Sequence, residues 1–387
     1  MVVIGVDPHK SSHTAAALEP GAGAASDTVR IEAALPGYRR LLAWGRRFGQ
    51  RRWAVENAWG LGRHLAQWLI ARGETVVDVP ATATARVRQL SRGRRKNDVL
   101  DAAAAAGVAA AQGDGIPVAA EGPSTVLGML DERRRNLTRQ RTRTVNQLHA
   151  LLRDLLPGGA RAELTARRAA GMLAGIRPAS PAERARKDLA RDLVEDLRAL
   201  DARLRANRTR MQDAVAGSGS SLPGIAGVGP AVAARLLGRT GRASRFPTAA
   251  AFAAHAGTAP VEIASADKAR HRLSRHGDRR LNNALHTIAL TQARMPATRG
   301  RAYYDAKIAE GKTRNEAMRC LKRRLADHVW RVMIADERRQ ARAAGPGGHT
   351  GATLTSSATS PTPTAGSSDK SLPGPANHNP TAPNPTT

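Results

Sequence analysis

The sequence predicts an α/β domain followed by two mainly helical units, and three observations support this division. Over residues 2–79, short apolar runs alternate with helical patterns, which is typical of helices packed on a sheet. Residues 121–215 carry two narrow leucine stripes, which predict long helices with one apolar face. Residues 217–221 are all glycine or serine and begin a compact third unit. We expect domains at 1–120, 121–215 and 216–335, and a disordered tail over 336–387.

Within the first domain, apolar runs predict strands at 2–6, 14–18, 53–55 and 75–79. The helices of the second unit are expected at 125–156 and 182–215, with Pro157-Gly158-Gly159 ending the first of them. Their single apolar stripes fit a helical hairpin or a coiled coil between copies of the chain. A plain pair of solvated helices fits the same pattern equally well.

The chain is strongly basic, with 61 Lys and Arg against 32 Asp and Glu and a net charge of +29. Such an excess favours a polyanionic partner, and phosphate backbones are the leading candidate. Aromatic residues, at 3%, are too scarce for base stacking to dominate binding. An anionic membrane surface is the alternative partner, but no segment predicts a spanning helix or a signal peptide. One cysteine, Cys320, excludes an internal disulfide framework and suits a reducing cytosol.

Four carboxylates follow apolar runs or open a helical pattern in the first domain. Asp7 and Glu56 end predicted strands, and Asp98 and Asp101 lie three residues apart at a predicted helix start. If they converge, divalent cations such as Mg²⁺ would remove their mutual repulsion and orient a phosphodiester. Taken singly, each has an ordinary explanation as a turn or helix-capping residue.

Residues 222–237 of the third unit look like a helix-hairpin-helix. There Gly227 and Gly229 would let the backbone approach a phosphate. Ser265 follows at the edge of a basic stretch, where it is either a nucleophile for a phosphodiester or an ordinary loop serine. The candidate phosphate-binding residues of that stretch are Lys268, Arg270, Arg272, Arg275, Arg279 and Arg280.

A set of segments in order along the chain, up to about Met333, resembles the insertion-sequence-110 family of transposases. The segments are residues 5–10, Glu56, 96–102, 141–149, 222–230, 256–260 with Ser265, and 275–281. Two positions depart from the family pattern. Asn97 stands where a small hydroxyl residue often precedes Asp98, and Ala266 stands where a glycine usually follows the serine.

The resemblance implies an RNase H-like (RuvC-like) first domain whose Asp7, Glu56, Asp98 and Asp101 bind Mg²⁺. It also implies that Ser265 is the nucleophile of a recombinase that forms a covalent phosphoserine. A structured RNA encoded by the element would guide it to donor and target DNA. The resemblance further implies a homo-oligomer, a dimer or tetramer, whose subunits are held together by the long helices. We expect such a protein in the bacterial cytoplasm, at the nucleoid.

Two other functions remain open on the sequence. A junction-resolving nuclease would use the acidic residues with water as the nucleophile and would not need Ser265. A basic scaffold that binds RNA or DNA without chemistry would not need the four carboxylates.

Overall fold

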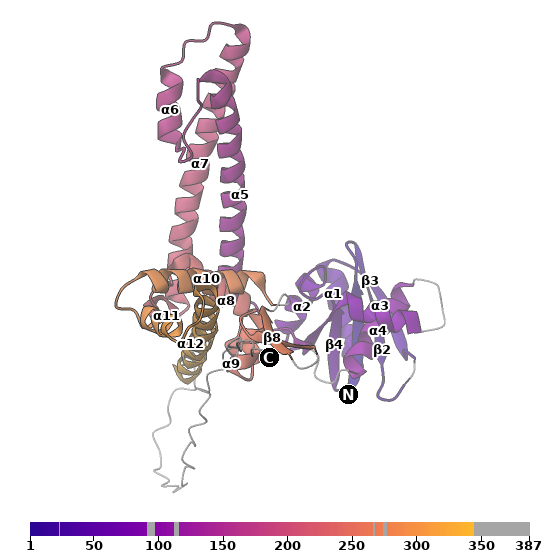
Figure 1. Ribbon diagram of the computed structural model, residues 1–387. Coiled ribbons are helices and arrows are strands. Elements are labelled where there is room, and N and C mark those ends of the chain that lie inside the picture. The colour runs from indigo at the N-terminus through magenta and orange to yellow at the C-terminus, as the bar shows by residue number, and fades with distance from the viewer. Residues whose placement is uncertain (23, 91–96, 112–115, 266–267, 274–276, 344–387) are drawn as a thin grey trace, which may run out of the picture. The chain divides into compact units, whose positions relative to one another are not determined.

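The computed structural model describes residues 1–22, 24–90, 97–111, 116–265, 268–273 and 277–343. Figure 1 shows a sheet domain, a long helical hairpin and a cluster of shorter helices. Asn97 lies within the described part, whereas Ala266 and Arg275 lie outside it.

A six-stranded mixed sheet forms the N-terminal domain, in the order β3-β2-β1-β4-β5-β6. The strands are β1 (Val2–Pro8), β2 (Ser12–Leu18), β3 (Asp27–Glu32), β4 (Arg51–Glu56), β5 (Val76–Val79) and β6 (Ile116–Pro117). Strands β1, β4 and β5 are parallel neighbours, while β2, β3 and β6 each run antiparallel to the strand they extend. All four predicted strands are confirmed. The edge strand β3 escaped prediction because it has only two apolar residues, Val29 and Ile31, and only Ile31 is buried.

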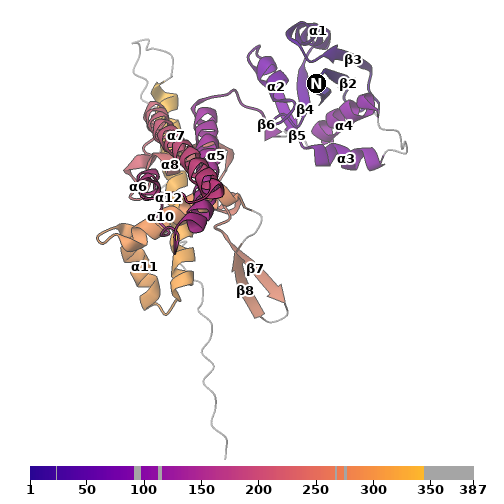
Figure 2. The ribbon, with the colours of Figure 1, turned by 90° about the horizontal axis from the view of Figure 1, so that it is seen from above.

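Two pairs of helices cover the two faces of this sheet, as Figure 2 shows. One face is covered by α1 (Leu35–Gly45) and α2 (Arg63–Ile70), and the other by α3 (Ala81–Leu90) and α4 (Asp98–Ala111). The first face packs around large side chains such as Trp53, Leu41 and Leu65. The second is lined by valines and by the alanines of α4, so that helix lies close to the strands.

Helix α4 approaches the sheet tightly at Gly5 in the middle of β1. A Cβ atom at this position would lie 1.9 Å from the carbonyl oxygen of Ala102 and 2.5 Å from the nitrogen of Ala106. Only glycine leaves room for this contact. The small residues on both sides therefore fix the position of α4 against β1.

The second unit is a helical hairpin built from α5 (Pro123–Leu155) and α7 (Pro181–Gly217), with α6 (Ala166–Ala174) beside its far end (Figure 1). The two long helices run antiparallel. Arg141 Nε pairs with Asp201 Oδ1 at 2.6 Å, and Asn207 Nδ2 donates to the carbonyl of Leu130. The hairpin agrees with the prediction, whereas α6 was not predicted. A coiled coil between copies of the chain stays a prediction.

The C-terminal unit is mainly helical and contains one two-stranded sheet. Its elements are η1 (Leu222–Gly224), α8 (Pro230–Thr240), η2 (Ala243–Arg245), α9 (Ala249–His255), β7 (Pro260–Ser265), β8 (Lys268–Leu273), α10 (Arg279–Arg294), α11 (Arg299–Ala309) and α12 (Arg314–Ala343). Its core includes Phe252, Leu285 and Leu325, together with Leu127 and Met211 from the base of the hairpin.

Helix α12 runs to Ala343 and so passes the domain boundary predicted at residue 335. The reason is Asp336, whose buried carboxylate accepts hydrogen bonds from Ser221 N at 2.8 Å and from Ser220 Oγ at 3.1 Å. Arg339, one turn later, pairs with the same carboxylate at 2.6 Å. These contacts tie the helix end to the start of the C-terminal unit.

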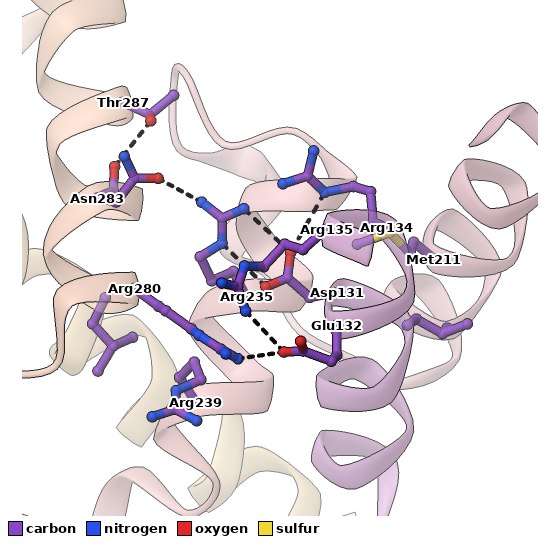
Figure 3. Close-up of polar contacts among 12 residues, drawn as sticks. Asp131, Glu132, Arg134, Arg135, Met211, Arg235, Arg239, Arg280, Asn283 and Thr287 are labelled. Carbon is purple, nitrogen blue, oxygen red and sulfur yellow. Dashed lines mark hydrogen bonds and ion pairs between the residues drawn. The ribbon is translucent and has the colours of Figure 1, made fainter. Parts of the chain in front are cut away.

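A polar network joins the base of the hairpin to α8 and α10 (Figure 3). Arg235 Nε of α8 lies 3.2 Å from Oδ2 of the buried Asp131 of α5, and its Nη1 donates to Asn283 Oδ1 of α10 at 2.7 Å. Arg280 of α10 pairs with Glu132 of α5 at 2.6 Å. Because the Asp131 carboxylate is buried, loss of Arg235 would leave it with only the longer ion pair to Arg134, at 3.5 Å.

Among the residues that the structure describes, no helix combines the length and the apolar character needed to cross a membrane.

Candidate active site

The four carboxylates predicted from the sequence gather at one edge of the N-terminal sheet. Asp7 and Glu56 stand at the carboxyl ends of β1 and β4, which are parallel neighbours. Asp98 and Asp101 occupy the first turn of α4. Since α4 packs against Gly5 of β1, its N-terminal turn comes to the same edge.

The charges of the other three carboxylates act on Asp7, whose side chain is buried. Burial is the largest cause that raises the pKa of Asp7 from 3.8 to about 6. His9 opposes this rise, while the negative charges of Glu56, Asp101 and Asp98 add to it. Glu56, Asp98 and Asp101 are therefore each close enough to Asp7 to disfavour its negative charge.

His9 belongs to the same cluster, although the sequence did not single it out. Its Nδ1 lies 3.5 Å from Asp7 Oδ2, and its Nε2 lies 4.0 Å from Asp98 Oδ1. One possible ligand atom from each of these three residues lies within 4.8 Å of the other two. The sequence signal that could have indicated His9 is its position two residues after Asp7, directly after the end of β1.

Two further contacts fix the acidic side chains. Thr84 of α3 donates its hydroxyl to Glu56 Oε1 at 2.8 Å. Arg30 of β3 lies with Nη1 3.7 Å from Asp98 Oδ2, and its side chain remains 68% exposed. An exposed cation thus stands at the rim of the acidic cluster, where it can meet a phosphate.

The residues present fit a divalent metal ion. Asp7 Oδ2 is buried and accepts no hydrogen bond, which is costly for an ionised oxygen. Carboxylate oxygens are the ligands that hard divalent cations prefer, and a bound cation would offset both the burial and the repulsion. Asp7, His9 and Asp98 each offer a ligand atom for such an ion, and the charges of Glu56 and Asp101 reach Asp7 from the same edge.

Ser265 lies in a different setting, as the last residue of β7. In the antiparallel register with β8, Ser265 is opposite Lys268, and Ile263 is opposite Arg270. Arg272 follows opposite Val261. Three of the predicted cationic residues therefore occupy every second position of β8, the strand that pairs with β7.

The base of this β7–β8 ribbon is tightly closed by two glycines. A Cβ atom at Gly277 would lie 2.2 Å from the nitrogen of Gly257. Asn282 Nδ2 donates to the carbonyl of Gly257 at 2.7 Å, and its Oδ1 accepts from Lys322 Nζ at 2.7 Å. Lys322 is buried, and burial lowers its pKa. Sequence reasoning missed Asn282 and Lys322, because only the fold brings them to the ribbon.

The remaining predicted nucleic-acid contacts fall in two places. Gly227 has a φ of 88°, and a Cβ atom there would lie 3.1 Å from Thr291 Cβ of α10. Gly229 precedes α8, whose N-terminus has no side-chain cap. Arg279 is exposed, whereas the guanidinium of Arg280 is engaged with Glu132.

Comparison with known proteins gives a consistent family assignment. Residues 4–157 match a family model for the DEDD transposases of IS110, described as "Transposase". Residues 220–305 match the model described as "Transposase IS116/IS110/IS902 family". The "insertion element IS116 uncharacterized 44.8 kDa protein" of Streptomyces clavuligerus is 25% identical, over 87% of this chain and 95% of its own length. A Thermus thermophilus RuvC structure aligns over 30% of this chain and all of its own, with 19% identity and a TM-score of 0.24.

Proposed function

Because this chain belongs to the IS110 family of transposases, we propose that it cuts and rejoins DNA through a covalent phosphoserine at Ser265. The family membership makes the chain a DNA transposase. The convergence of Asp7, Glu56, Asp98 and Asp101 at one sheet edge supports metal-assisted cleavage, and the cationic positions of β8 opposite the strand of Ser265 support the serine as the nucleophile. A scaffold without chemistry has no need of such a costly arrangement.

We take the N-terminal domain to be RNase H-like. The family match and the mixed sheet, with helices on both faces and carboxylates at one edge, support this assignment. The family and the acidic cluster point to a divalent metal, and we propose Mg²⁺. When bound, the metal would neutralise charge on the phosphate at this edge.

The chemistry of Ser265 is a transesterification. Its hydroxyl oxygen attacks the phosphorus, a serine–phosphate bond forms, and the bond from phosphorus to one strand oxygen breaks. The serine proton needs an acceptor, and the acidic cluster is the candidate once it meets Ser265. The departing strand oxygen takes up a proton, and the reverse attack by a second strand oxygen rejoins DNA without an external energy source.

Lys268, Arg270 and Arg272 are proposed to hold the phosphate during this exchange. Positive charge placed at a developing phosphorane stabilises it more than it stabilises the ground state. Their alternation along β8, with Lys268 opposite Ser265, supports this role. We propose that Arg275 and Arg279 also contact the DNA backbone.

The partners we propose are donor DNA, target DNA, an element-encoded guide RNA and further copies of this chain. The net charge of +29 supports contact with several phosphate backbones. The long α5–α7 hairpin offers a surface for a second copy. Such a complex would work in the bacterial cytoplasm, where the DNA lies.

The test of this function is a strand-cleavage assay on DNA bearing the element ends, with the small RNA encoded beside the gene. Ser265→Ala should abolish cleavage and strand exchange while leaving RNA and DNA binding intact. A junction-resolving nuclease would instead keep cutting without this serine and would yield hydrolysed ends. Full cleavage by Ser265→Ala would therefore replace the covalent mechanism by water attack.

A further inference from the structure

The loop over residues 57–62, directly after Glu56, is tied at its start to strand β5. Asn57 adopts a φ of 48°, and its nitrogen donates to the carbonyl of Val79 at 2.9 Å. Ala58 N donates to Asp78 Oδ1 at 2.7 Å. A Cβ atom at Gly60 would lie 2.4 Å from Asn57 Nδ2, so the Asn57 side chain packs closely over Gly60. These contacts fix the start of the loop against β5.

This loop presents Trp59 and Leu61 to solvent, with 49% and 50% of their surfaces exposed. The other tryptophans of the chain are packed. Trp44, Trp53 and Trp330 donate their ring nitrogens to protein oxygens, and Trp68 lies buried beneath the guanidinium of Arg72. Trp59 thus differs from the other four tryptophans. Its loop leaves much of the ring in water, and exposing that apolar surface costs free energy.

The loop also lies beside the acidic cluster. Trp59 is three residues beyond Glu56, so their Cα atoms are at most about 10 Å apart. A Cβ atom at Gly62 would lie 2.9 Å from the carbonyl of Glu56 and 3.2 Å from Pro8 Cγ. The returning end of the loop therefore packs on the residue next to Asp7.

We propose that Trp59, assisted by Leu61, stacks on an unpaired base of the DNA strand whose phosphate lies at the acidic cluster. The proposal rests on the DNA chemistry proposed above. Along a strand, the base is the apolar group nearest to a held phosphate. Aromatic rings stack on bases whatever their sequence, and apolar side chains wedge between base steps. One such contact needs no abundance of aromatics.

A protein partner fits the loop less well. Stable protein interfaces bury about 800 Å² on each side, which two side chains on a short loop do not supply. The exposed Arg30 at the rim of the cluster and the large positive charge of the chain both favour a nucleic acid.

The experiment uses the full chain with Ca²⁺ in place of Mg²⁺, so that binding is measured without cleavage. The probes are a duplex with a short single-stranded gap and the same duplex fully paired. The wild-type protein should prefer the gapped duplex, and Trp59→Ala should reduce that preference about tenfold. Trp59→Phe should retain most of it. Met129→Ala, at an exposed position of α5, should leave it unchanged.

Photo-crosslinking from bromouracil in the gap gives a second readout. The adduct should appear on the tryptic peptide Trp53–Arg63, in which Trp53 is fully buried and only Trp59 is exposed. Equal gap preference for wild type and Trp59→Ala, with no adduct on this peptide, would overturn the proposal. So would a change in oligomer mass without DNA in Trp59→Ala, which would assign the loop to a protein contact.

The stacking of Trp59 and the covalent mechanism at Ser265 can be tested separately. Binding in Ca²⁺ does not use the serine, so Ser265→Ala should show the same gap preference as wild type. A failed covalent mechanism would leave this result standing. Conversely, a covalent adduct at Ser265 with no effect of Trp59→Ala would defeat the stacking proposal alone.

Discussion

The acidic cluster and Ser265 stand on different kinds of support. The carboxylates project from the ends of two central strands and from a helix that touches the sheet at Gly5. Ser265 ends one strand of a two-stranded ribbon whose firm anchorage is at its base, through Gly257 and Gly277. Two-stranded ribbons are marginally stable alone. We infer from this difference that the acidic cluster is formed in the free protein, whereas the proposed serine site is completed on assembly with nucleic acid.

The largest effect should come from inactivating either part of the proposed active site, the acidic cluster or Ser265. Asp7→Asn and Ser265→Ala should each lower strand cleavage by at least about 10³-fold, because each removes a group that acts on the reacting phosphate. If the two parts meet between subunits, mixing the two inactive variants should restore measurable cleavage in mixed oligomers. The measurement is the cleavage rate of the mixture against each variant alone.

No recovery on mixing would show that both parts of one active site come from the same chain. Normal cleavage by Asp7→Asn alone would show that the acidic cluster has only a structural role and is not part of the active site.

A smaller effect is expected at the base of the serine ribbon. Asn282→Ala removes the hydrogen bonds to the carbonyl of Gly257 and from Lys322. It should lower cleavage about 100-fold, since small misplacements of a reacting group cost this much. The matched control is Asn283→Ala on the same helix, which loses a contact to Arg235 instead.

Asn283→Ala should preserve the cleavage rate more fully, and both variants should bind DNA. Equal rates for the two variants would mean that the ribbon base does not position Ser265.

The pKa of Asp7 gives a third test, measured as stability. In the unfolded chain this carboxyl has its ordinary pKa of 3.8, and in the folded, metal-free protein it is raised to about 6. The folded state therefore holds the proton more tightly between these values. The free energy of unfolding should fall as pH rises from about 4 to above 6, by up to about 3 kcal/mol.

Mg²⁺ added above pH 7 should recover much of this loss, and Asp7→Asn should remove both the pH dependence and the metal effect. Denaturation curves across this pH range, with and without the metal, are the measurement. A metal-free protein that gains stability through this window would contradict the account of the acidic cluster.

The smallest effect should come from the tail. Truncation at Gly345 leaves α12 complete, because that helix ends at Ala343, and removes a segment rich in Pro, Ser, Thr and Gly. Cleavage should stay within about twofold of the full chain, since such a segment buries little surface. Complete loss in a folded, truncated protein would assign the tail a part in the reaction.

The parts of the fold and of the site that could be predicted are those whose signal lies in neighbouring residues of the sequence. The central strands and the long helices carry apolar residues in short runs or at regular spacing. The strands at 2–6, 53–55 and 75–79 were therefore predicted, and the structure confirms them. The edge strand β3 carries mixed polarity and was missed. The carboxylates could be named because each follows a strand or opens a helix.

Contacts made only by the fold could not be predicted. His9 joins the acidic cluster because the chain turns just after β1. Lys322 reaches Asn282 across forty residues of sequence, and no local pattern marks such a pair. The predicted role of Arg280 in binding phosphate must now compete with its ion pair to Glu132, which only the packing of α10 on α5 creates.

The most direct measurement traps wild-type protein on a suicide DNA substrate and maps the covalent product. The account predicts a nucleotide linked to Ser265 within the tryptic peptide Phe246–Lys268. An adduct on Ser274 would keep the covalent mechanism and move the nucleophile along the chain. Free hydrolysed ends, no adduct, and an active Ser265→Ala variant would contradict the account and favour a metal-dependent nuclease.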